Sequence, residues 1–422
     1  MKKIIQFILK FFCRLILKKY QPEIIGITGS VGKTSAKLAV EVVLSPSFIV
    51  RSSPKNYNTE IGVPLTIINT KNPGRSLFGW LVVFLKALSL IVARDRNYPQ
   101  ILILEMAADH PGDIEYLVNL ARPKIGVITA VGPTHLEFFK SVENVFKEKN
   151  KLIAAIDKSG WAIINSDDPL ALNSKNSAKA KTITFGLSPG ADLLAADIIL
   201  DKEKYSLNFK LGYRGSFVPV SLENILGRPA LYAVLAGAAV GLARGLNLVE
   251  ISLCLKNYQS PSGRLKIIPG IKNTKIIDDT YNSSPLSVKA GLEVLSHLRC
   301  AGHKFAVLGD MLELGSHTES AHKEIGEEVA RLGLDYLVAV GENSRHLAAS
   351  AKEYGMNEDR IYTFDKSSEA GKFIQDKIGE GDLLLIKGSQ GSRMEKIVKE
   401  IMAEPERAAE LLVRQGEEWE RR

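Results

Sequence analysis

The feature that most constrains this chain is a glycine-rich segment between an apolar run and a helical pattern. This segment, Gly26–Ser35, ends in Lys33-Thr34-Ser35 and is followed by a helical pattern from Lys37. A strand, a glycine loop and a helix in this order cradle phosphates with backbone N–H groups. Lys33 would reach the β- and γ-phosphates of a nucleoside triphosphate, and Thr34 would offer a hydroxyl to Mg²⁺. The glycines do not match the general P-loop spacing, so a glycine-rich turn with a chance Lys-Thr is the alternative.

Composition sets the broad class of the protein. A length of 422 residues is enough for two or three domains, and 45% hydrophobic with 24% charged residues is ordinary for a globular chain. The net charge of +8 fits a protein that handles anionic nucleotides or lies near an anionic membrane. The sequence contains no basic stripe interleaved with aromatic residues, which is the pattern that would indicate nucleic-acid binding. The three cysteines are scattered without metal-ligand or disulfide spacing, so we expect a cytoplasmic protein.

Two apolar segments stand apart from this pattern. The first 20 residues are too charged for a signal peptide and too short to span a bilayer. They predict an amphipathic helix, with Ile4–Leu17 as its apolar part, that lies at a membrane interface or packs on the protein. Leu77–Ala93 is interrupted only by Lys86, and a buried helix is its simplest interpretation. We expect both segments to attach the protein peripherally to the cytoplasmic face of a membrane, with packing on the protein as the alternative.

Apolar runs alternate with helical patterns along most of the chain. Buried strands are predicted at 101–104, 125–131 and 161–164, with helices at 113–120 and 142–156 between them, which indicates a doubly wound parallel sheet. Residues 181–220 predict a small antiparallel element. The alternation restarts after 260. We therefore predict an α/β protein with four parts: an amphipathic helix (1–21), a P-loop central ATPase domain (22–260), a Rossmann-like C-terminal domain (261–403), and a charged tail that forms a frayed helix (404–422).

Two polar side chains follow predicted strands of the first half. Glu105 ends one strand, and His135 lies shortly after the next. Ligands in open α/β sheets bind outside the carboxyl ends of the strands, so both side chains can face a bound nucleotide. Glu105 is placed to hold Mg²⁺, with a solvated or capping carboxylate as the alternative. His135 is either a ligand or a structural histidine, and Lys149 by composition lies on an ordinary charged helix face.

The second half carries a similar polar cluster. Asp278–Pro285 follows a strand and opens a helix. Its acids, Tyr281 and Asn282 suit contacts to ribose or to a phosphate-bound metal, although such residues also form ordinary capped loops. Arg264, just after the predicted boundary, can reach across a cleft to a phosphate. Lys387 ends the last core strand.

Together these residues resemble the Mur ligases of peptidoglycan synthesis. The likeness covers about residues 22 to 403 and rests on eight motifs: Thr28–Thr34, Asn58–Pro64, Glu105-Met106, His135–Glu137, Gly263-Arg264, Asp278–Pro285, Leu308–Gly315 and Lys387–Ser389. The last three are similar to those of the family members that add D-Ala-D-Ala to a UDP-linked muramoyl tripeptide.

The resemblance implies a role for each matched residue. Residues for ATP would be Gly29, Ser30, Gly32, Lys33, Thr34, Ser35, Arg264, Asp279, Tyr281 and Asn282. Two Mg²⁺ ions would be held by Thr34, Glu105, His135 and Lys149. Lys149 would act as a carbamate, since it lies at the spacing after His135 where the family carries a carbamylated lysine. The catalytic set would be Lys33, His135, Lys149 and Arg264, and the substrates would meet Asn58, Thr59, Lys387, Ser389 and Arg393.

The implied reaction is ATP-dependent amide formation between D-Ala-D-Ala and a nucleotide-linked muramoyl peptide, by way of an acyl phosphate. The chain departs from the family pattern in three places. Only about twenty residues precede the first strand, where such ligases have a UDP-binding domain. Pro229-Ala230 replaces residues near the adenine, and Arg393 would supply an arginine expected at 390. Another Mur-type or folate-type ligase, and a membrane-attached binding protein without turnover, are the alternatives.

Overall fold

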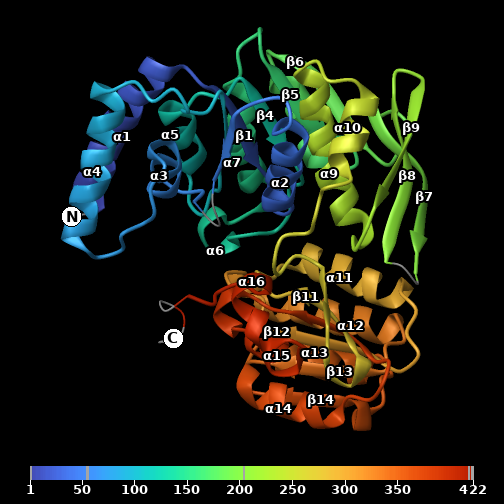
Figure 1. Cartoon of the computed structure of the whole chain (residues 1–422). Coiled ribbons are helices and arrows are strands. Elements are labelled where there is room, and N and C mark those ends of the chain that lie inside the picture. Colours follow the sequence, from blue (N-terminus) through green and yellow to red (C-terminus); the bar gives the residue numbers. More distant parts are fainter. Residues whose placement is uncertain (1, 54–56, 203–204, 417–418, 420–422) are drawn as a thin grey trace.

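The computed structural model describes residues 2–53, 57–202, 205–416 and 419. The chain forms two α/β units, each built on its own sheet and joined near residue 260 (Figure 1). The predicted fold class is therefore confirmed. The four-part division of the chain by residue number stays a prediction.

The N-terminal unit contains a nine-stranded sheet in the order β2-β3-β1-β4-β5-β6-β7-β8-β9. The first seven strands in this order run parallel to their neighbours, and β8 pairs antiparallel with both β7 and β9. The bounds are β1 (Glu23–Thr28), β2 (Val50–Ser52), β3 (Ile101–Glu105), β4 (Ile125–Ile128), β5 (Trp161–Asn165), β6 (Lys181–Gly186), β7 (Leu193–Asp201), β8 (Ser206–Tyr213) and β9 (Ser216–Leu222). The antiparallel element expected over 181–220 is present in β7–β9, and it continues the main sheet because β6 pairs in parallel with both β5 and β7.

Helices cover both faces of this sheet. One face is packed by α2 (Lys33–Leu44), α9 (Gly227–Ala243) and α10 (Leu248–Leu255), and the other by α3 (Gly62–Ile68), α5 (Asp113–Leu120) and α7 (Val142–Ala154). Short helices are α6 (Leu136–Phe139), α8 (Pro169–Asn173) and η1 (Ser174–Ser177). Small residues let α9 approach α2 closely. A Cβ added at Gly237 would lie 2.8 Å from the backbone of Ala39, so the helix that carries the glycine loop is fixed from behind.

The C-terminal unit is a six-stranded sheet in the order β10-β11-β15-β12-β13-β14, parallel except for β10. The strands are β10 (Lys266–Pro269), β11 (Lys275–Asp279), β12 (Lys304–Gly309), β13 (Tyr336–Val340), β14 (Ile361–Phe364) and β15 (Leu383–Lys387). The helices are α11 (Pro285–His297), α12 (Thr318–Arg331), α13 (Ser344–Glu353), α14 (Ser367–Lys377) and α15 (Glu395–Ile401), with one-turn helices η2 (Ile271–Asn273), η3 (Gly315–His317), η4 (Glu358–Arg360) and η5 (Gln390–Ser392).

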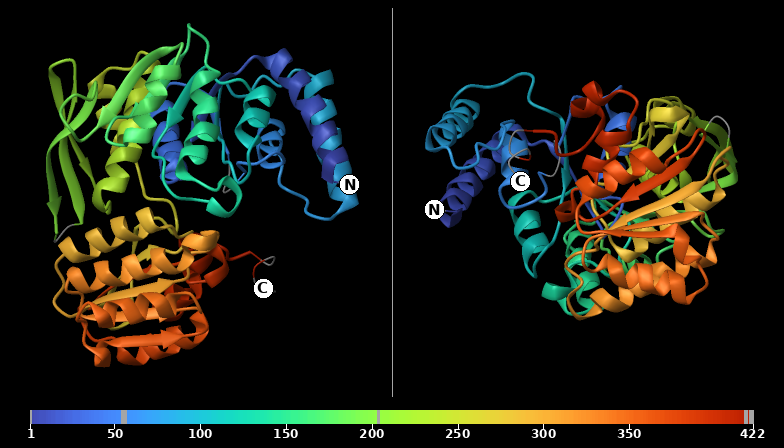
Figure 2. Two further views of the ribbon diagram at one scale, coloured as in Figure 1. Left: turned by 180° about the vertical axis from the view of Figure 1, so that it is seen from behind. Right: turned by 90° about the horizontal axis from the view of Figure 1, so that it is seen from below.

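The two apolar segments form α1 (Lys2–Tyr20) and α4 (Leu77–Val92), which pack against each other at one edge of the N-terminal unit (Figures 1 and 2). Each helix buries one face and exposes the other. The interpretation of 77–93 as a buried helix is wrong, since only Trp80, Val83, Ala87 and Leu90 of α4 are buried. Within the described part of the chain, no helix has the length and apolar character needed to cross a membrane.

The tail differs from the frayed helix expected over 404–422. Its described residues include η6 (Pro405–Arg407) and α16 (Ala408–Leu411), and residues 412–416 then continue without helix. Leu412 is buried against the second sheet, and Arg414 pairs with the buried Glu395 at 2.9 Å. Arg414 also donates to the carbonyl oxygens of Thr280 and Tyr281. A charged sequence therefore packs as part of the unit, because its arginine finds buried acceptors.

Replacing Arg414 by alanine should destabilise the protein by about 2 kcal/mol or more, because it removes one partner of a buried ion pair. The control is Arg407→Ala, whose ion pairs with Glu404 and Glu410 are exposed to solvent and should contribute far less to stability. Urea unfolding measures both. Equal losses for the two variants would mean that the tail is not packed as described.

Candidate active site

The glycine loop lies at the centre of the first sheet, where the carboxyl ends of β3, β1 and β4 are adjacent. Its shape requires glycine at two positions. Gly29 and Gly32 have φ values of 147° and 84°, and a Cβ on Gly29 would lie 2.0 Å from Oγ1 of Thr129. Ser30 Oγ bonds the backbone of Gly132 at 3.0 Å, which ties the loop to the segment after β4. The loop is therefore held open toward the N-terminus of α2.

Lys33, the first residue of α2, folds back over this loop. Its Nζ donates to the carbonyl oxygens of Gly29 at 2.8 Å and Ser30 at 3.3 Å. Burial lowers the pKa of Lys33, and the carboxylate of Glu105 acts in the opposite direction. A partly buried ammonium at a helix N-terminus is suited to an anionic phosphate.

Several polar side chains near the glycine loop contact the carboxylate of Glu105. Its carboxylate is almost fully buried and accepts from Thr34 Oγ1 and from Asn58 Nδ2, both at 3.0 Å. Lys37 Nζ lies 3.9 Å from the same carboxylate. The structure thus brings together three residues predicted from sequence, and adds Lys37, which sequence analysis did not identify.

The donor set at Glu105 fits a magnesium ion. Mg²⁺ binds hard oxygen ligands and takes one or two protein carboxylates together with phosphate oxygens and water. The Thr34 hydroxyl and the Glu105 carboxylate are such oxygens, and they lie in contact. Over the residues that the structure describes, no three His, Cys, Asp or Glu side chains group as metal ligands. His135 therefore does not join Glu105 in one cluster of that kind.

His135 instead connects the two units. It has a positive φ of 52°, and its ring lies between Asp109, at 3.4 Å from Nε2, and Glu313, at 2.7 Å from Nδ1. Asp109 follows β3, whereas Glu313 belongs to the C-terminal unit. Contact with His135 lowers the pKa of Glu313. Neither acid was singled out from sequence, although Asp109 follows a strand end and Glu313 lies in a quoted motif.

Lys149 is buried on α7, contrary to the solvated helix face that composition alone predicts. Burial lowers its pKa to about 7, and the nearby charge of Lys33 acts in the same direction. Near pH 7, Lys149 is consequently a neutral amine in a large fraction of the molecules. Such an amine is nucleophilic, which is the requirement for a lysine that reacts with CO₂.

On the other side of the cleft, Arg264 lies over Tyr281. Its guanidinium carbon is 4.0 Å from the centre of the tyrosine ring. Gly263, with φ of 69°, accepts from Tyr281 N at 3.1 Å and donates its own N–H to Asp278. Within the described residues, the buried Nε of Arg264 has no hydrogen-bond partner. That donor is suited to an anionic ligand entering the cleft.

The remaining predicted residues mostly contact one another. Lys387 and Asp279 form a buried ion pair at 2.6 Å, and Lys387 also donates to the carbonyl oxygen of Asn282. Ser389 accepts from Leu312 N at 2.9 Å and so fixes the neighbouring loop. Arg393 pairs with Glu395. Binding of ligand by these residues stays a prediction.

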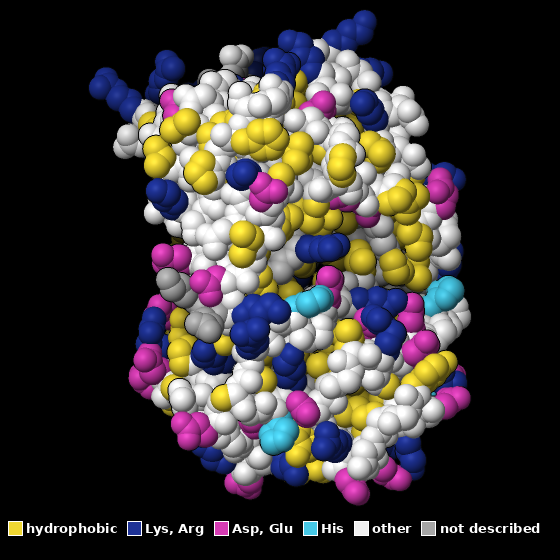
Figure 3. All heavy atoms as spheres, turned by 90° about the vertical axis from the view of Figure 1, so that its right-hand side faces the viewer, with side chains coloured by type: hydrophobic (Ala, Val, Ile, Leu, Met, Phe, Trp, Pro, Cys, Tyr) yellow, Lys and Arg dark blue, Asp and Glu magenta, His cyan; other side chains and the backbone are white. Residues whose placement is uncertain are grey.

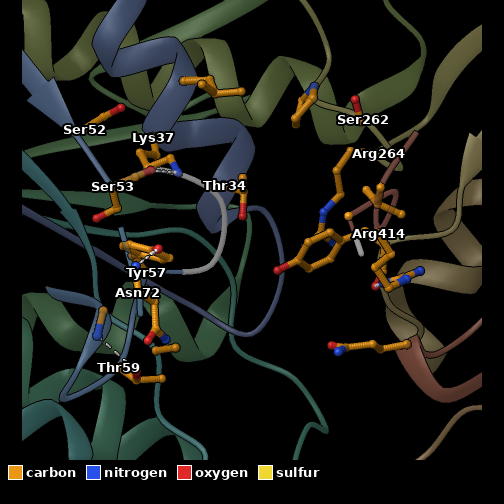
Figure 4. A pocket seen from close by; sticks show the side chains of 18 of the residues that line it. Thr34, Lys37, Ser52, Ser53, Tyr57, Thr59, Asn72, Ser262, Arg264 and Arg414 are labelled. Carbon is orange, nitrogen blue, oxygen red and sulfur yellow. Dashed lines mark hydrogen bonds between the residues drawn. The ribbon is translucent and has the colours of Figure 1, made fainter. Parts of the chain in front are cut away.

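Two cavities meet at this site. The larger, about 990 Å³, lies between the units, and Figure 4 shows Arg264 and Arg414 across it from Thr34, Lys37 and Tyr57. The smaller, about 310 Å³, lies behind the glycine loop. Thr34 and Arg264 line both cavities. Of the other predicted residues, the larger is also lined by Thr59 and Tyr281, and the smaller by Gly32, Ser35, Asp279 and Lys387.

Comparison with known proteins agrees with this geometry. Residues 85–241 match the Mur ligase middle domain, and residues 263–390 match the Mur ligase glutamate ligase domain. The chain is 32% identical to the UDP-N-acetylmuramoyl-tripeptide–D-alanyl-D-alanine ligase of Mycobacterium leprae over 87% of this chain and 71% of that protein. It belongs to the Mur ligase family. The ligase is also 28% identical to the Bacillus subtilis enzyme of the same name, over 94% of this chain and 79% of the relative.

The fold of the family is shared over almost the whole chain. The crystal structure of MurF ligase from Thermotoga maritima in complex with ADP superimposes with a TM-score of 0.77 at 27% identity, covering 94% of this chain and 83% of that one. The ligase is accordingly an ATP-dependent amide ligase that joins an acid to an amino compound. The P-loop interpretation is confirmed, and a chance glycine turn is excluded.

Proposed function

We propose that this ligase adds D-Ala-D-Ala to a UDP-linked muramoyl tripeptide in the cytoplasm, a step in peptidoglycan precursor synthesis. The observation that carries the proposal is the junction of two cavities at Thr34 and Arg264. A junction of this kind lets a nucleotide and an acceptor meet at the γ-phosphate. The motifs of the C-terminal unit and the names of the similar enzymes support the choice of substrates.

In this proposal ATP occupies the smaller cavity. The phosphates lie along the glycine loop, with Lys33 over the β- and γ-phosphates. The base lies toward Pro229, Ala230 and Tyr232, which line the far end of the cavity; the Tyr232 hydroxyl is 3.1 Å from Asp167. An apolar wall with a few polar groups is the usual environment of an adenine. Pro229-Ala230 is therefore compatible with base binding by packing.

The larger cavity takes the acceptor and the amine. A carboxylate of the acceptor attacks the γ-phosphate, which gives an acyl phosphate and ADP. The amine of D-Ala-D-Ala then attacks the acyl carbon, and phosphate leaves as the amide forms. Lys33 and Arg264 would stabilise the negative charge on the transferring group from opposite sides. Water would be excluded when the two units close, since the groups come from both.

Thr34 and Glu105 would hold a magnesium ion, and a carbamate on Lys149 with His135 would supply a second set of ligands. Bound cations screen the repulsion between the carboxylate and the γ-phosphate. Asn58 would orient Glu105 through its hydrogen bond, and Lys37 would offset its charge. These roles would explain why three polar side chains, Thr34, Asn58 and Lys37, meet at the buried carboxylate of Glu105.

An assay of phosphate release with purified components tests the proposal. Release should require ATP, Mg²⁺, a UDP-muramoyl tripeptide and D-Ala-D-Ala together, and mass spectrometry should show a product equal to both substrates less one water. Omission of each component in turn is the control. An amide formed only with another amino acid would favour a different Mur-type or folate-type ligase. No amide with any acceptor and amine would favour a binding protein without turnover.

A further inference from the structure

The net positive charge of the ligase comes from two segments of the chain. Residues 2–20 and 71–94 contain ten Lys and Arg and no Asp or Glu. The whole chain has 55 basic and 47 acidic residues, so the remainder, with 45 basic and 47 acidic residues, is close to neutral. These segments contain α1, α4 and the chain that flanks α4. The net charge therefore describes one part of the surface rather than the molecule as a whole.

The same two helices expose an apolar surface. Ten large apolar side chains between 47% and 78% exposed define it, and we call it the α1/α4 face: Ile4, Phe7, Phe11, Leu77, Phe78, Leu81, Val82, Leu85, Leu88 and Val92. On α1 the exposed stripe continues into Arg14 and Lys18 with the spacing of one helical face. A contiguous apolar surface of this kind marks an interaction site.

The two helices are held as one surface. The rings of Phe12 and Phe84 stack at 6.1 Å between centroids. Lys19 Nζ donates to the carbonyl oxygens of Leu90, Ile91 and Ala93 at the end of α4, at 3.0, 2.8 and 2.6 Å. Those carbonyls have no partner within the helix, so the ammonium caps α4 and fixes its position beside α1. These contacts fix α1 and α4 relative to each other, so the α1/α4 face has a defined shape.

Other surfaces of the ligase differ. Figure 3 shows the side of the molecule that carries β7–β9, and over the lower half of that view, where the C-terminal unit lies, acidic and basic side chains are mixed. Exposed apolar residues elsewhere occur in small sets, such as Val249 and Leu253 on α10. Among the described residues, only the α1/α4 face joins ten exposed large apolar side chains with two chain segments, 2–20 and 71–94, whose charged residues are all basic.

We propose that the α1/α4 face docks the ligase on the surface of an anionic lipid bilayer, with both helices lying in the interface. The aromatic and aliphatic side chains would enter the boundary of the hydrocarbon, while Arg14, Lys18 and Lys86 contact phosphate groups. A second copy of the chain is a poorer occupant, because the charged residues that α1 and α4 contribute are all basic and two such faces would repel. The larger cavity lies beside this surface, since Gln6 of α1 donates to its lining residue Glu60 at 3.1 Å.

Vesicle flotation tests the proposal with the full chain. The ligase should float with vesicles of equal parts phosphatidylcholine and phosphatidylglycerol at low salt. Flotation should fall by about tenfold with phosphatidylcholine alone or in about 1 M salt, where charges at the surface are screened. Equal flotation on both vesicles, or none at low salt, would overturn the proposal.

Two sets of variants locate the contact. The triple variant Phe78→Ser, Leu81→Ser, Leu85→Ser should lose flotation by about tenfold or more, and its control is Val249→Ser, Leu253→Ser, at positions of similar exposure. Arg14→Glu, Lys18→Glu should act likewise, against Lys158→Glu, Lys175→Glu. Phosphate release in solution should not change in any of these variants, since none of these residues lines the two cavities.

The outcomes separate lipid from protein occupants. If the triple variant floats like the parent, the α1/α4 face is not the contact and the proposal fails. If the parent forms a dimer in gel filtration that the triple variant abolishes, and neither floats, the face is instead an interface between copies.

Discussion

Replacing Lys33 by alanine is expected to lower the rate of amide formation by about a hundredfold or more, the effect of removing one electrostatic group that stabilises a transferring phosphoryl. The ammonium of Lys33 is partly buried at the N-terminus of α2, where it donates to the glycine loop. Its loss leaves the loop N–H groups in place. Nucleotide binding should therefore weaken less than the chemical step slows. Steady-state phosphate release and ADP binding by calorimetry measure the two effects.

The control for this prediction is Lys158→Ala, because Lys158 is exposed and lies outside both cavities. It should keep the parent rate. The thermal midpoint of Lys33→Ala should stay within a few degrees of the parent, which shows that the loop still folds. A Lys33→Ala protein that turns over at the parent rate would remove the lysine from the proposed mechanism.

Replacing Lys149 by alanine is expected to leave the ligase nearly inactive, with partial rescue by an added short carboxylate. A buried ammonium beside Lys33 would repel a metal ion, whereas a carbamate would attract one. The amine lone pair forms a bond to the carbon of CO₂ and the nitrogen loses a proton, so the site gains one negative charge. A small carboxylate in the cavity left by alanine would replace that charge.

The pH dependence of this modification follows from the pKa of Lys149, which burial lowers to about 7. Carbamate formation needs the neutral amine. Lys149 is neutral in about a tenth of the molecules at pH 6 and in about nine tenths of them at pH 8. With limiting bicarbonate, activity should therefore rise as the pH passes through about 7 and level off above it. With saturating bicarbonate the rise should shift to lower pH.

The matched control is Lys147→Ala, an exposed lysine on the same helix. It should keep parent activity and need no carboxylate. Full activity of Lys149→Ala, or equal losses for both variants, would contradict a role for the carbamate. Mass spectrometry of the intact protein under CO₂ should show an added carboxyl group in the parent and in Lys147→Ala only.

Sequence alone determined the elements whose signals are local. The phosphate-binding loop was predicted because glycines and a Lys-Thr pair lie between an apolar run and a helical pattern. This order of residues is the one that cradles phosphates at a helix N-terminus. The helix at 113–120 has the predicted bounds, and the strands predicted at 101–104 and 161–164 each end one residue later. Their apolar periodicity is set by the residues themselves, since each buries one face or both against a sheet.

Tertiary structure decided what depends on residues far apart in the chain. Lys149 is buried, because α7 packs against the sheet that carries the glycine loop. His135 meets Glu313 only because the two units face each other. The tail is ordered by the pair of Arg414 with Glu395, where its charged sequence predicted fraying.

The apolar run at 77–92 shows the same limit most clearly. Its composition is that of a buried helix, but only one stripe of it finds a partner, and the rest lies on the surface beside α1. An apolar side chain lowers the free energy of the protein when it leaves water, and this tendency can be read from the sequence. Which surface covers it depends on the shape of the neighbouring elements, and that is fixed only when the whole chain has folded.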